Sequence, residues 1–509
     1  MAAAESIYSC PQCMTLLDPS NSSLPSLNPT LVPRDILETN DPPLESQIPF
    51  LRDFVSNGRA RLSALNAKIA SLQSAMDRLR KERDAIAVDI RKHEGGLSPL
   101  RRMPPEILTH IFAFNLLSRY FNERALWTVS AVCARWRTIV LSQPGFWTTI
   151  DYNHSEKFND TLNFRLQTQL RRSSQMPLNI KFCTSDDDAP TFEEMCMLQT
   201  VCGHAARWKT VSIEGRKELF NGLQSFVRDQ FASLVELSIE VMYNDDDVPL
   251  LDVFHDAPRL QRVAFNTELW SWPVMLALPG SQLLEYSGSS TWGGHLHALR
   301  NATSLVECTL EIHGHDPHTI PSTPILLPSL LRLSLSESQF LECLETPALL
   351  ELYCGDASAV LPFLGRQNCK LQKLVLWNPA NGADLTQIVD AAPTIENLAL
   401  AFPLPATFAH HFRSRPNLAP SLRCLSTGLA RDPPTIEDDF MQGIESRWQR
   451  GPIQSVKVYG IGCSPSFVER LELLQADGLE FTPYTEALPL IYDVVPSQMM
   501  LNSVDYPNY

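Results

Sequence analysis

The sequence predicts an α/β multidomain chain: first a coiled-coil helix, then a small all-helical unit, then an irregular solenoid of repeats with a curved parallel sheet. Three observations predict this order: a heptad seam, two short amphipathic helical segments after it, and an L-x-x-L-x-L pattern that recurs from residue 205 onward. The chain has 509 residues, which is more than one hydrophobic core holds. The expected segments are a disordered N-terminal stretch, the coiled coil, the helical unit, the repeat domain, and a C-terminal helix with a tail, at 1–47, 48–94, 97–150, 170–462 and 463–509.

Composition argues against several classes of protein. The net charge of -15 opposes nucleic-acid binding, because phosphate needs a basic surface. No apolar run reaches the ~18 residues of a membrane span, and the N-terminus lacks the basic and apolar regions of a secretory signal. We therefore expect no nucleic-acid partner, no membrane partner, and a location in the cytoplasm, the nucleus or both. The 38 prolines against 21 glycines indicate stiff turns rather than flexible linkers.

The residues that could carry chemistry are scattered. Most of the 12 cysteines are expected to be small apolar core residues. Cys10 and Cys13 have the spacing of half a zinc site, but no second ligand pair lies nearby, so we expect no bound metal. The sequence has no phosphate-binding glycine-rich loop, no H-E-x-x-H and no G-x-S-x-G motif. We predict a protein with no cofactor and no catalytic residues.

A long helix is predicted over 48–94 by apolar residues at alternating spacings of three and four, sustained over about five heptads. Gly58 and Arg83 interrupt the apolar character of this seam, and Gly95 and Gly96 are expected to end the helix. The helix would join two copies of the chain as a homodimer, join a partner, or fold back onto its own chain. The seam residues are Val55, Gly58, Leu62, Leu65, Ile69, Leu72, Met76, Leu79, Arg83, Ile86 and Ile90.

A short helix is predicted to begin at Pro104 and Pro105. Proline is tolerated in the first turn of a helix, and Glu106 complements the helix dipole there. Residues one and four positions apart then form a single apolar face. These residues are Ile107, Leu108, Ile111 and Phe112.

A second helix is predicted over 125–140, followed by Pro144 and an aromatic pair. Arg135 and Arg137 would point away from its apolar face. Cys133 on that face has no histidine nearby in sequence, so it is expected to be a packed residue rather than a nucleophile. Short helices bury little area alone and gain by docking on another protein; the alternative is a subdomain packed only on its own chain. The expected apolar face comprises Leu126, Val129, Val132, Cys133, Trp136 and Val140.

Three ordered blocks in this region, "MPPEILTHIF" (103–112), "VSAVCARWRTIV" (129–140) and "QPGFW" (143–147), resemble the F-box. The wider layout is similar to that of F-box proteins of basidiomycete fungi. The resemblance implies binding to the Skp adaptor of a cullin-RING ubiquitin ligase, with the rest of the chain presenting a substrate. Met103 stands where the family usually has leucine, and the connection at 114–123 is longer than usual. The matching adaptor-facing positions are Pro104, Pro105, Glu106, Ile107, Leu108, Ile111, Phe112, Val129, Cys133, Trp136 and Trp147.

From residue 205 a proline or small residue is repeatedly followed by L-x-x-L-x-L, as in "LPSLLRLSL" (327–335). The first anchors recur every 19 to 27 residues, which is the period of leucine-rich repeats. Side chains alternate along each strand, so Leu333 points inward and Arg332 outward, and such units stack into a solenoid. A globular α/β domain is the structural alternative. The anchors are Trp208, Leu234, Leu260, Leu283, Leu305, Leu330, Leu349, Leu371, Ile395 and Leu422.

The outward strand positions form either a solvated sheet face or a substrate-recognition surface. The main hypothesis is a substrate-recognition subunit of an Skp–cullin–F-box ubiquitin ligase that binds an unidentified protein substrate. The alternative is a non-catalytic scaffold or self-associating protein whose F-box-like unit is non-functional. The candidate substrate-facing residues are Glu236, Arg262, Glu307, Arg332, Glu351, Tyr353, Lys373 and Asn397.

Overall fold

The computed structural model divides the chain into two compact units, Met1–Leu108 and Thr109–Tyr509. Most of the N-terminal stretch expected to be disordered, and the C-terminal tail from 485 to 509, lie outside the described residues. The structure describes residues 8–9, 16–17, 38, 40–116, 123–153, 160–184, 189–227, 231–242, 251–267, 276–313, 323–367, 369–429, 435–459 and 464–484. No helix in these ranges combines the length and apolar character needed to cross a membrane.

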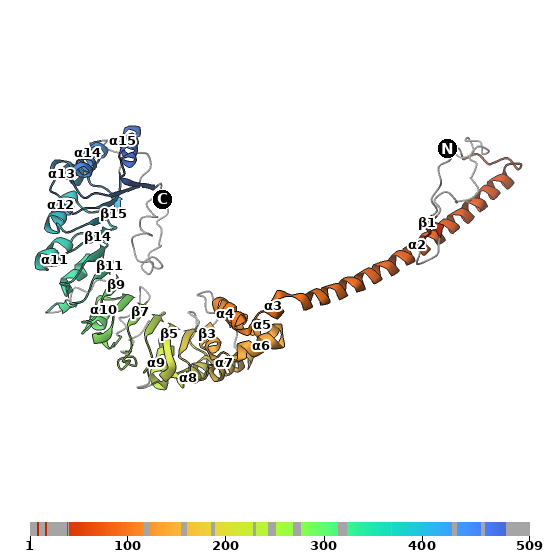
Figure 1. The fold of residues 1–509 in the computed structure, drawn as a ribbon, viewed down its shortest axis with the longest axis horizontal. Helices are drawn as coiled ribbons and strands as arrows, with labels where there is room; N and C mark the ends of the chain where they lie inside the picture. Colours follow the sequence, from red (N-terminus) through yellow and green to blue (C-terminus); the bar gives the residue numbers. More distant parts are fainter. Residues whose placement is uncertain are drawn as a thin grey trace. The chain divides into compact units, whose positions relative to one another are not determined.

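The first unit is dominated by one helix, α2 (Ile48–Leu97), of 50 residues (Figure 1). Its described companions are two short antiparallel strands, β1 (Tyr8–Ser9) and β2 (Leu16–Leu17), and the short helix α3 (Pro99–Arg102). The expectation that Gly95 and Gly96 end α2 is wrong, because the helix runs through both glycines. Each glycine costs a helix only about 1 kcal/mol. The proline at 99 decides the end, since it drives the preceding Ser98 out of helical backbone, to ψ 129°.

The apolar seam of α2 is not buried anywhere along the helix. No residue of the helix is buried, and seam residues such as Ile69 and Leu72 are each 52% exposed. Helical propensity and short-range ion pairs alone give little stability to an amphipathic helix in water. The seam therefore needs a partner surface.

The second unit is a mixed helical and parallel-sheet structure. Its main sheet has fourteen described strands, all hydrogen-bonded to neighbours in sequence order, and all pairings are parallel. These are β3 (Thr149–Asn153), β4 (Leu178–Cys183), β5 (Trp208–Gly215), β6 (Glu236–Val241), β7 (Arg262–Thr267), β8 (Glu285–Ser290), β9 (Glu307–Ile312), β11 (Arg332–Leu335), β13 (Glu351–Cys354), β14 (Lys373–Leu376), β15 (Asn397–Pro403), β16 (Cys424–Gly428), β17 (Ser455–Tyr459) and β18 (Glu480–Tyr484). The strands β10 (Ile325–Leu326) and β12 (Leu344–Glu345) form a separate parallel pair.

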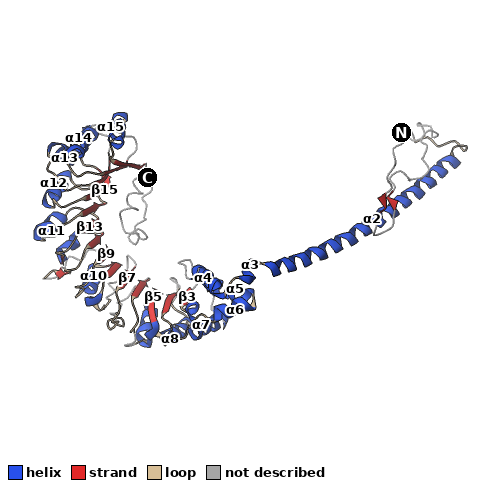
Figure 2. Ribbon diagram, in the orientation of Figure 1, coloured by secondary structure: helices blue, strands red, loops and turns tan. Residues whose placement is uncertain are grey.

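Helices and 3-10 turns connect the strands, and within this unit they line the outer side of the arc that the strands follow (Figure 2). The helix α4 (Pro105–Leu116) spans the boundary between the two units. The others are α5 (Glu123–Val132), α6 (Ala134–Leu141), η2 (Pro144–Trp147), α7 (Asp160–Arg172), α8 (Phe192–Cys202), η3 (Ala205–Arg207), α9 (Lys217–Phe226), η4 (Gly280–Gln282), α10 (Trp292–Leu299), η6 (Ser338–Cys343), α11 (Val360–Arg366), α12 (Gly382–Ala391), α13 (Ala406–Ser414), α14 (Thr435–Arg450) and α15 (Pro465–Ala476).

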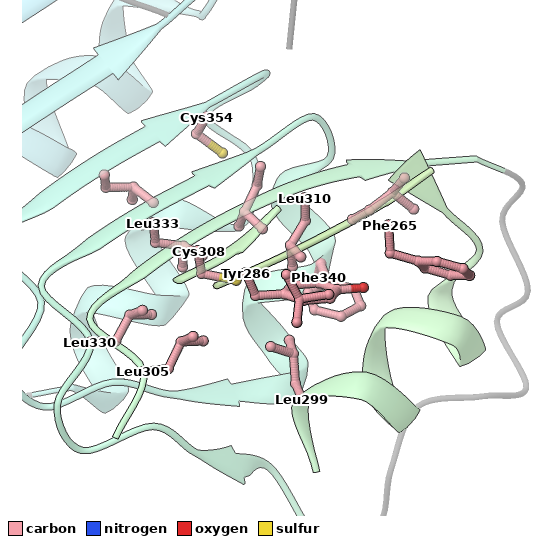
Figure 3. Packing of buried hydrophobic residues seen from close by; sticks show 14 of the residues in the cluster. Phe265, Tyr286, Leu299, Leu305, Cys308, Leu310, Leu330, Leu333, Phe340 and Cys354 are labelled. Atoms are coloured by element: carbon pink, nitrogen blue, oxygen red, sulfur yellow. The ribbon is translucent and has the colours of Figure 1, made fainter. Parts of the chain in front are cut away.

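The core lies between the sheet and these connectors. All ten anchors of the sequence pattern are at most 1% exposed. Figure 3 shows how Leu305 and Leu330 occupy equivalent places beside neighbouring strands, with Cys308 and Leu333 one pleat further along. A single strand with its connector has too little apolar surface to form a core. Each anchor is therefore covered by the equivalent residue beside the next strand.

A repeated turn explains the prolines before many anchors. The amide of Leu330 donates to the carbonyl of Leu327 at 3.3 Å, and Pro328 takes the second position of that turn, where its fixed φ is favourable. The same bond joins Leu260 to Ala257, Leu283 to Gly280, Leu305 to Ala302, Leu349 to Thr346, Ile395 to Ala392 and Leu422 to Ala419. In four of these six turns a proline again follows the acceptor residue.

The sheet is longer than the recurring pattern indicated. The strands β3 and β4 precede the first recognised copy at 205, and β18 follows the last at 451–459. The residue ahead of β3, Trp147, lies in the "QPGFW" block that was assigned to the helical unit. After Leu178, β4 has the shorter spacing L-x-I-x-F in place of L-x-x-L-x-L, with a register shift at Leu178.

Candidate functional site

The helix α4 carries two apolar stripes with different surroundings, not the single face that we expected. Leu108 and Phe112, one turn apart, are 1% and 4% exposed. Ile107 and Ile111, their immediate neighbours in sequence, are 48% and 39% exposed. Successive helical residues are separated by about 100° around the axis, so the inner stripe packs while the outer stripe remains at the surface.

Aromatic contacts hold the helices of the second unit together in this region. The ring of Phe112 meets that of Trp136 on α6 edge-on, with centroids 4.8 Å apart. Trp127 on α5 meets Trp147 in the same way at 5.4 Å, and the guanidinium of Arg172 on α7 lies 4.4 Å from the Trp147 ring centroid. Burial lowers the pKa of Arg172, but the ring faces offer it a cation–π contact.

The continuous helix predicted over 125–140 is wrong, because the chain breaks at Cys133. This residue is extended, at φ -158° and ψ 168°, so α5 ends at Val132 and α6 begins at Ala134. The Cys133 sulfur accepts the amide hydrogen of Trp136 at 3.4 Å and thereby caps α6. Cysteine is not a preferred N-cap, so this break could not be predicted from local sequence. Cys133 is exposed rather than packed on an apolar face.

Trp147 is fully buried and donates its indole N–H to the carbonyl of Val140 at 3.0 Å. A partner protein would therefore meet the surface that Trp147 supports, not Trp147 itself. The same holds for Leu108 and Phe112. Val129 and Trp136 are half-buried, while Pro104, Pro105 and Glu106 are exposed with Ile107 and Ile111.

Two further apolar residues of this region are exposed: Phe114, which was not predicted, and Val132, which was expected on the apolar face of the second helix. Phe114 continues the outer stripe of α4 three residues beyond Ile111 and is 83% exposed. Val132, at the end of α5, is also exposed. The spacing of 107, 111 and 114 was the available signal for Phe114. Residues 117–122, in the long connection after α4, lie outside the described residues.

A second candidate surface lies on the strand face opposite the helices. Because the pairing is in register, the first outward residue of each strand lies beside that of the next strand. Arg262 donates to Glu236 at 2.9 Å, and Arg332 donates to Glu307 at 2.9 Å. The complete row from β6 to β15 is Glu236, Arg262, Glu285, Glu307, Arg332, Glu351, Lys373 and Asn397. Glu285 was not among the predicted residues, although it stands two residues after the anchor Leu283, as Glu236 does after Leu234.

The row borders a hollow of about 400 Å³ over β6 to β9. Its floor is made of small side chains, Ser238, Ala264 and Ser287, and its charged lining comprises Glu236, Glu285 and Glu307 against the single Arg262. The hydrogen bond to Glu236 raises the pKa of Arg262, which stays charged. This part of the face therefore carries more negative than positive charge.

Further along the sheet the outward face becomes more apolar. The Tyr353 hydroxyl donates to Glu351 at 2.7 Å, and the Lys373 ammonium lies 4.9 Å from the Tyr353 ring centroid. Burial, together with that hydrogen bond, raises the pKa of Tyr353 above its usual range. Tyr353, Val375 and Ala399 are buried together with Trp377 packed against them. These contacts are those of a packed surface.

Metal-binding groups do not gather in the described part of the chain: no cluster of three or more His, Cys, Asp or Glu side chains could hold an ion there. Cys10 and Cys13 lie outside the described residues. Within the described ranges, Cys202, Cys308 and Cys354 are buried, and burial raises the pKa of each thiol. A thiol in such surroundings is a packing residue.

Comparison with known families identifies the helical region. Residues 100–153 match the family model described as F-box-like. The match begins in α3, includes α4, α5, α6 and η2, and ends at β3. A search among curated proteins found no match to the chain. The chain thus contains an F-box-like domain, and F-box domains typically bind Skp-type adaptors, which points to a role in F-box-mediated protein interaction.

Proposed function

We propose that this chain is the substrate-recognition subunit of an Skp–cullin–F-box ubiquitin ligase. The observation that carries the proposal is the outer stripe of α4, where Ile107 and Ile111 are exposed inside the F-box-like region. Exposed aliphatic side chains in a row gain free energy when a partner covers them, about 25 cal/mol for each Å² of apolar surface. The adaptor would cover this stripe, and the buried Leu108 and Phe112 would hold it in place.

The chain would act by proximity, without catalytic residues of its own. The adaptor would connect it to the cullin and its RING subunit, in the cytoplasm, the nucleus or both. A substrate bound elsewhere on the chain would then be held near the ubiquitin-loaded enzyme. Holding two reactants together raises their effective concentration, which accounts for the rate gain without further chemistry on this chain.

The sheet and its connectors after the F-box-like region, over 170–462, would be the substrate-binding part, as a leucine-rich-repeat-like solenoid. The repeated turn before each anchor and the in-register parallel strands support this assignment. The hollow over β6 to β9 is the proposed contact site, because a solenoid offers its strand face as an extended binding surface. Its excess of glutamates favours a substrate segment that carries lysine or arginine.

Adaptor binding by the full chain tests the proposal. Ile107→Asp and Ile111→Asp each place a charge on the outer stripe and are expected to abolish co-purification with the Skp adaptor while the chain stays folded. Val468→Asp is the matched control, because Val468 is an exposed helical residue of α15 with 41% exposure. Its adaptor binding should equal that of the native chain. A folded native chain that does not bind the adaptor would refute the ligase role.

That refutation would leave a second candidate function, a non-catalytic scaffold that associates with itself. The observation in its favour is α2, whose apolar seam has no buried residue. Self-association through this coiled coil is compatible with the ligase role as well, since several copies of a receptor would then be joined. Sedimentation of the full chain measures it independently of the adaptor.

A further inference from the structure

We infer that α2 pairs with α2 of a second copy of this chain in an antiparallel coiled coil whose two-fold axis lies close to residue 74. The inference rests on the self-association proposed above and adds its geometry. The occupant of the exposed seam is thus a second copy, and three properties of the helix select it. These are the charges that flank the seam, the two irregular seam positions, and the length of the helix.

The flanking charges are distributed unevenly along α2. In the heptad with Leu62 at position a and Leu65 at position d, the flanking e and g positions are basic in the first half of the helix. The second half has mostly acidic residues at these positions. The basic ones are Arg52, Arg59, Arg61 and Lys68, and those of the second half are Arg80, Glu82, Asp89 and Glu94. Two copies of a helix with this pattern have complementary charges when they run in opposite directions.

In an antiparallel pair the basic flanking residues of one copy lie beside the acidic flanking residues of the other. When Leu62 faces Ile86 of the second copy, g positions meet g positions, so Lys68 lies beside Glu82 and Arg61 beside Asp89 of the second copy. The e positions bring Arg52 beside Glu94. The two-fold axis repeats each contact, and the remaining flanking positions bring no like charges together. Opposite charges at these positions set the partner and the orientation of a coiled coil.

A parallel pair in register loses these contacts. There each g residue meets the e residue five positions later in the other copy. Lys68 would face Gln73, Arg61 would face Asn66, and Asp89 would face Glu94, which is a like-charge contact. No pair of opposite charges would form across that interface. Electrostatics therefore favours the antiparallel arrangement.

The irregular seam residues give the same answer independently of the flanking charges. In a parallel pair Gly58 would face Gly58 and leave a void, and Arg83 would face Arg83 in the seam. The antiparallel pair instead places the large Ile90 against Gly58 and sets Leu65 against Arg83. The Arg83 guanidinium already lies 2.6 Å from Asp84 of its own helix, so its charge is compensated at the edge of the seam.

The helix length fits this arrangement almost end to end. The seam layers run from Leu51 against Leu97 to Leu72 against Met76, and then repeat by symmetry. The paired length from 51 to 97 is about 70 Å, at about 1.5 Å of rise per residue. The two C-terminal ends of α2 would emerge at opposite ends of this rod. Each copy would therefore have room to bind its own adaptor.

Cross-linking of the full chain tests the orientation. Ala75→Cys places a thiol at a g position beside the two-fold axis, so a short bismaleimide is expected to join residue 75 to residue 75. Leu65→Cys would be joined to itself in a parallel pair. In the antiparallel pair its two copies are about 27 Å apart, at about 1.5 Å per residue. Peptide mass spectrometry distinguishes these products from links among the 12 native cysteines.

Charge reversal supplies a second measurement that does not depend on cysteine chemistry. Lys68→Glu and Glu82→Lys should each raise the dimer dissociation constant about tenfold, since each creates two like-charge contacts. The double variant should restore it to near the native value. Lys81→Glu is the matched control, because position 81 faces away from the seam and the same charge change should leave the dimer unchanged.

The outcomes separate the two claims. A chain that sediments as a monomer at micromolar concentration overturns the self-association and with it this inference. A dimer that links at position 65 and not at 75, or whose charge reversals behave like Lys81→Glu, leaves self-association standing and overturns the antiparallel geometry. A dimer that links at 75 and is rescued by the double reversal supports both.

Discussion

The Phe112 ring meets the Trp136 ring edge-on at 4.8 Å, and this contact joins α4 to α6. Phe112 is 4% exposed, so removing its ring leaves a cavity and deprives Trp136 of its aromatic neighbour. Phe112→Ala should lower the free energy of unfolding of the helical region by about 3–5 kcal/mol. Urea unfolding followed by tryptophan fluorescence measures it. Phe114→Ala, which removes an exposed ring from the same helix, should change stability by less than about 0.5 kcal/mol.

His295 should make the stability of the second unit depend on pH. It is buried beside the Tyr286 hydroxyl at 3.2 Å and the Glu311 carbonyl at 3.0 Å, and burial lowers its pKa to about 4. The unfolded chain takes up this proton near pH 6.5 and the folded chain only near pH 4. Stability is therefore full above pH 6.5 and is lost as the pH falls toward 4, by about 2 kcal/mol between pH 7 and 5.

Urea unfolding of the native chain and of His295→Gln at pH 7 and pH 5 isolates this contribution, because other histidines titrate in both proteins. The native chain should lose more stability than the variant over this interval. Equal losses in the two proteins would exclude His295 as the cause.

Arg447 should be essential for the packing of α13 against α14. It is 5% exposed, and its guanidinium donates to the carbonyls of Phe412, Gly443, Arg415 and Leu418. Arg447→Met removes every one of these donors and should cost at least about 3 kcal/mol of stability. Arg423→Met is the control, since the Arg423 side chain is half exposed and its ion pair with Glu396, at 3.3 Å, lies at the surface. Similar melting temperatures for the two variants would contradict the prediction.

The ion pair between Arg262 and Glu236 should contribute little to stability. Both side chains are more than 40% exposed, so solvent screens their 2.9 Å contact. Glu236→Gln is expected to change the free energy of unfolding by less than about 1 kcal/mol, as measured by thermal and urea unfolding. A loss above about 2 kcal/mol would mean that the pair is structural. If the free energy of unfolding changes as little as predicted, substitutions of charged residues along the hollow can be used to measure ligand binding without a change in folding.

Substrate capture should respond to the charge of the hollow. Glu285→Lys reverses one of the three glutamates that line it and should weaken binding of a basic substrate segment by about tenfold or more. Glu342→Lys makes the same charge change within η6, a connector outside the hollow, and should leave binding unchanged. Pull-down of arginine- and lysine-rich peptides by the full chain measures this difference. Equal binding by both variants would place the substrate elsewhere.

The apolar pattern was enough to predict several elements. The alternating three and four spacing predicted α2 almost to its ends, because the period of a helix is imposed by local backbone geometry. The L-x-x-L-x-L pattern predicted which leucines would be buried, from Leu234 to Leu422, since strand alternation and the preceding turn are also local. The F-box-like region was found from three short blocks in the right order.

Other features depend on contacts between distant residues. Ile107 and Leu108 are adjacent residues of one helix, and both are aliphatic. Packing against the rest of the chain buries Leu108 and leaves Ile107 exposed. The break at Cys133 has no local signal, because it depends on two hydrogen bonds at the helix ends. The Cys133 sulfur accepts the amide hydrogen of Trp136 at the start of α6, and the Arg137 side chain donates to the Ser130 carbonyl near the end of α5. The strands β3 and β4 were missed because Trp147, ahead of β3, was assigned to the helical unit and β4 has the shorter spacing L-x-I-x-F after Leu178.

The spacing of apolar residues along short stretches of chain was enough to predict the periodic elements, the buried anchors and the F-box-like region. Three features follow from contacts that form on folding: which stripe of α4 stays exposed, where the second helix breaks, and which charges lie side by side across β6 to β15. These depend on residues such as Phe112 and Trp136, or Glu236 and Arg262, which are 24 to 26 positions apart in sequence and meet only after folding.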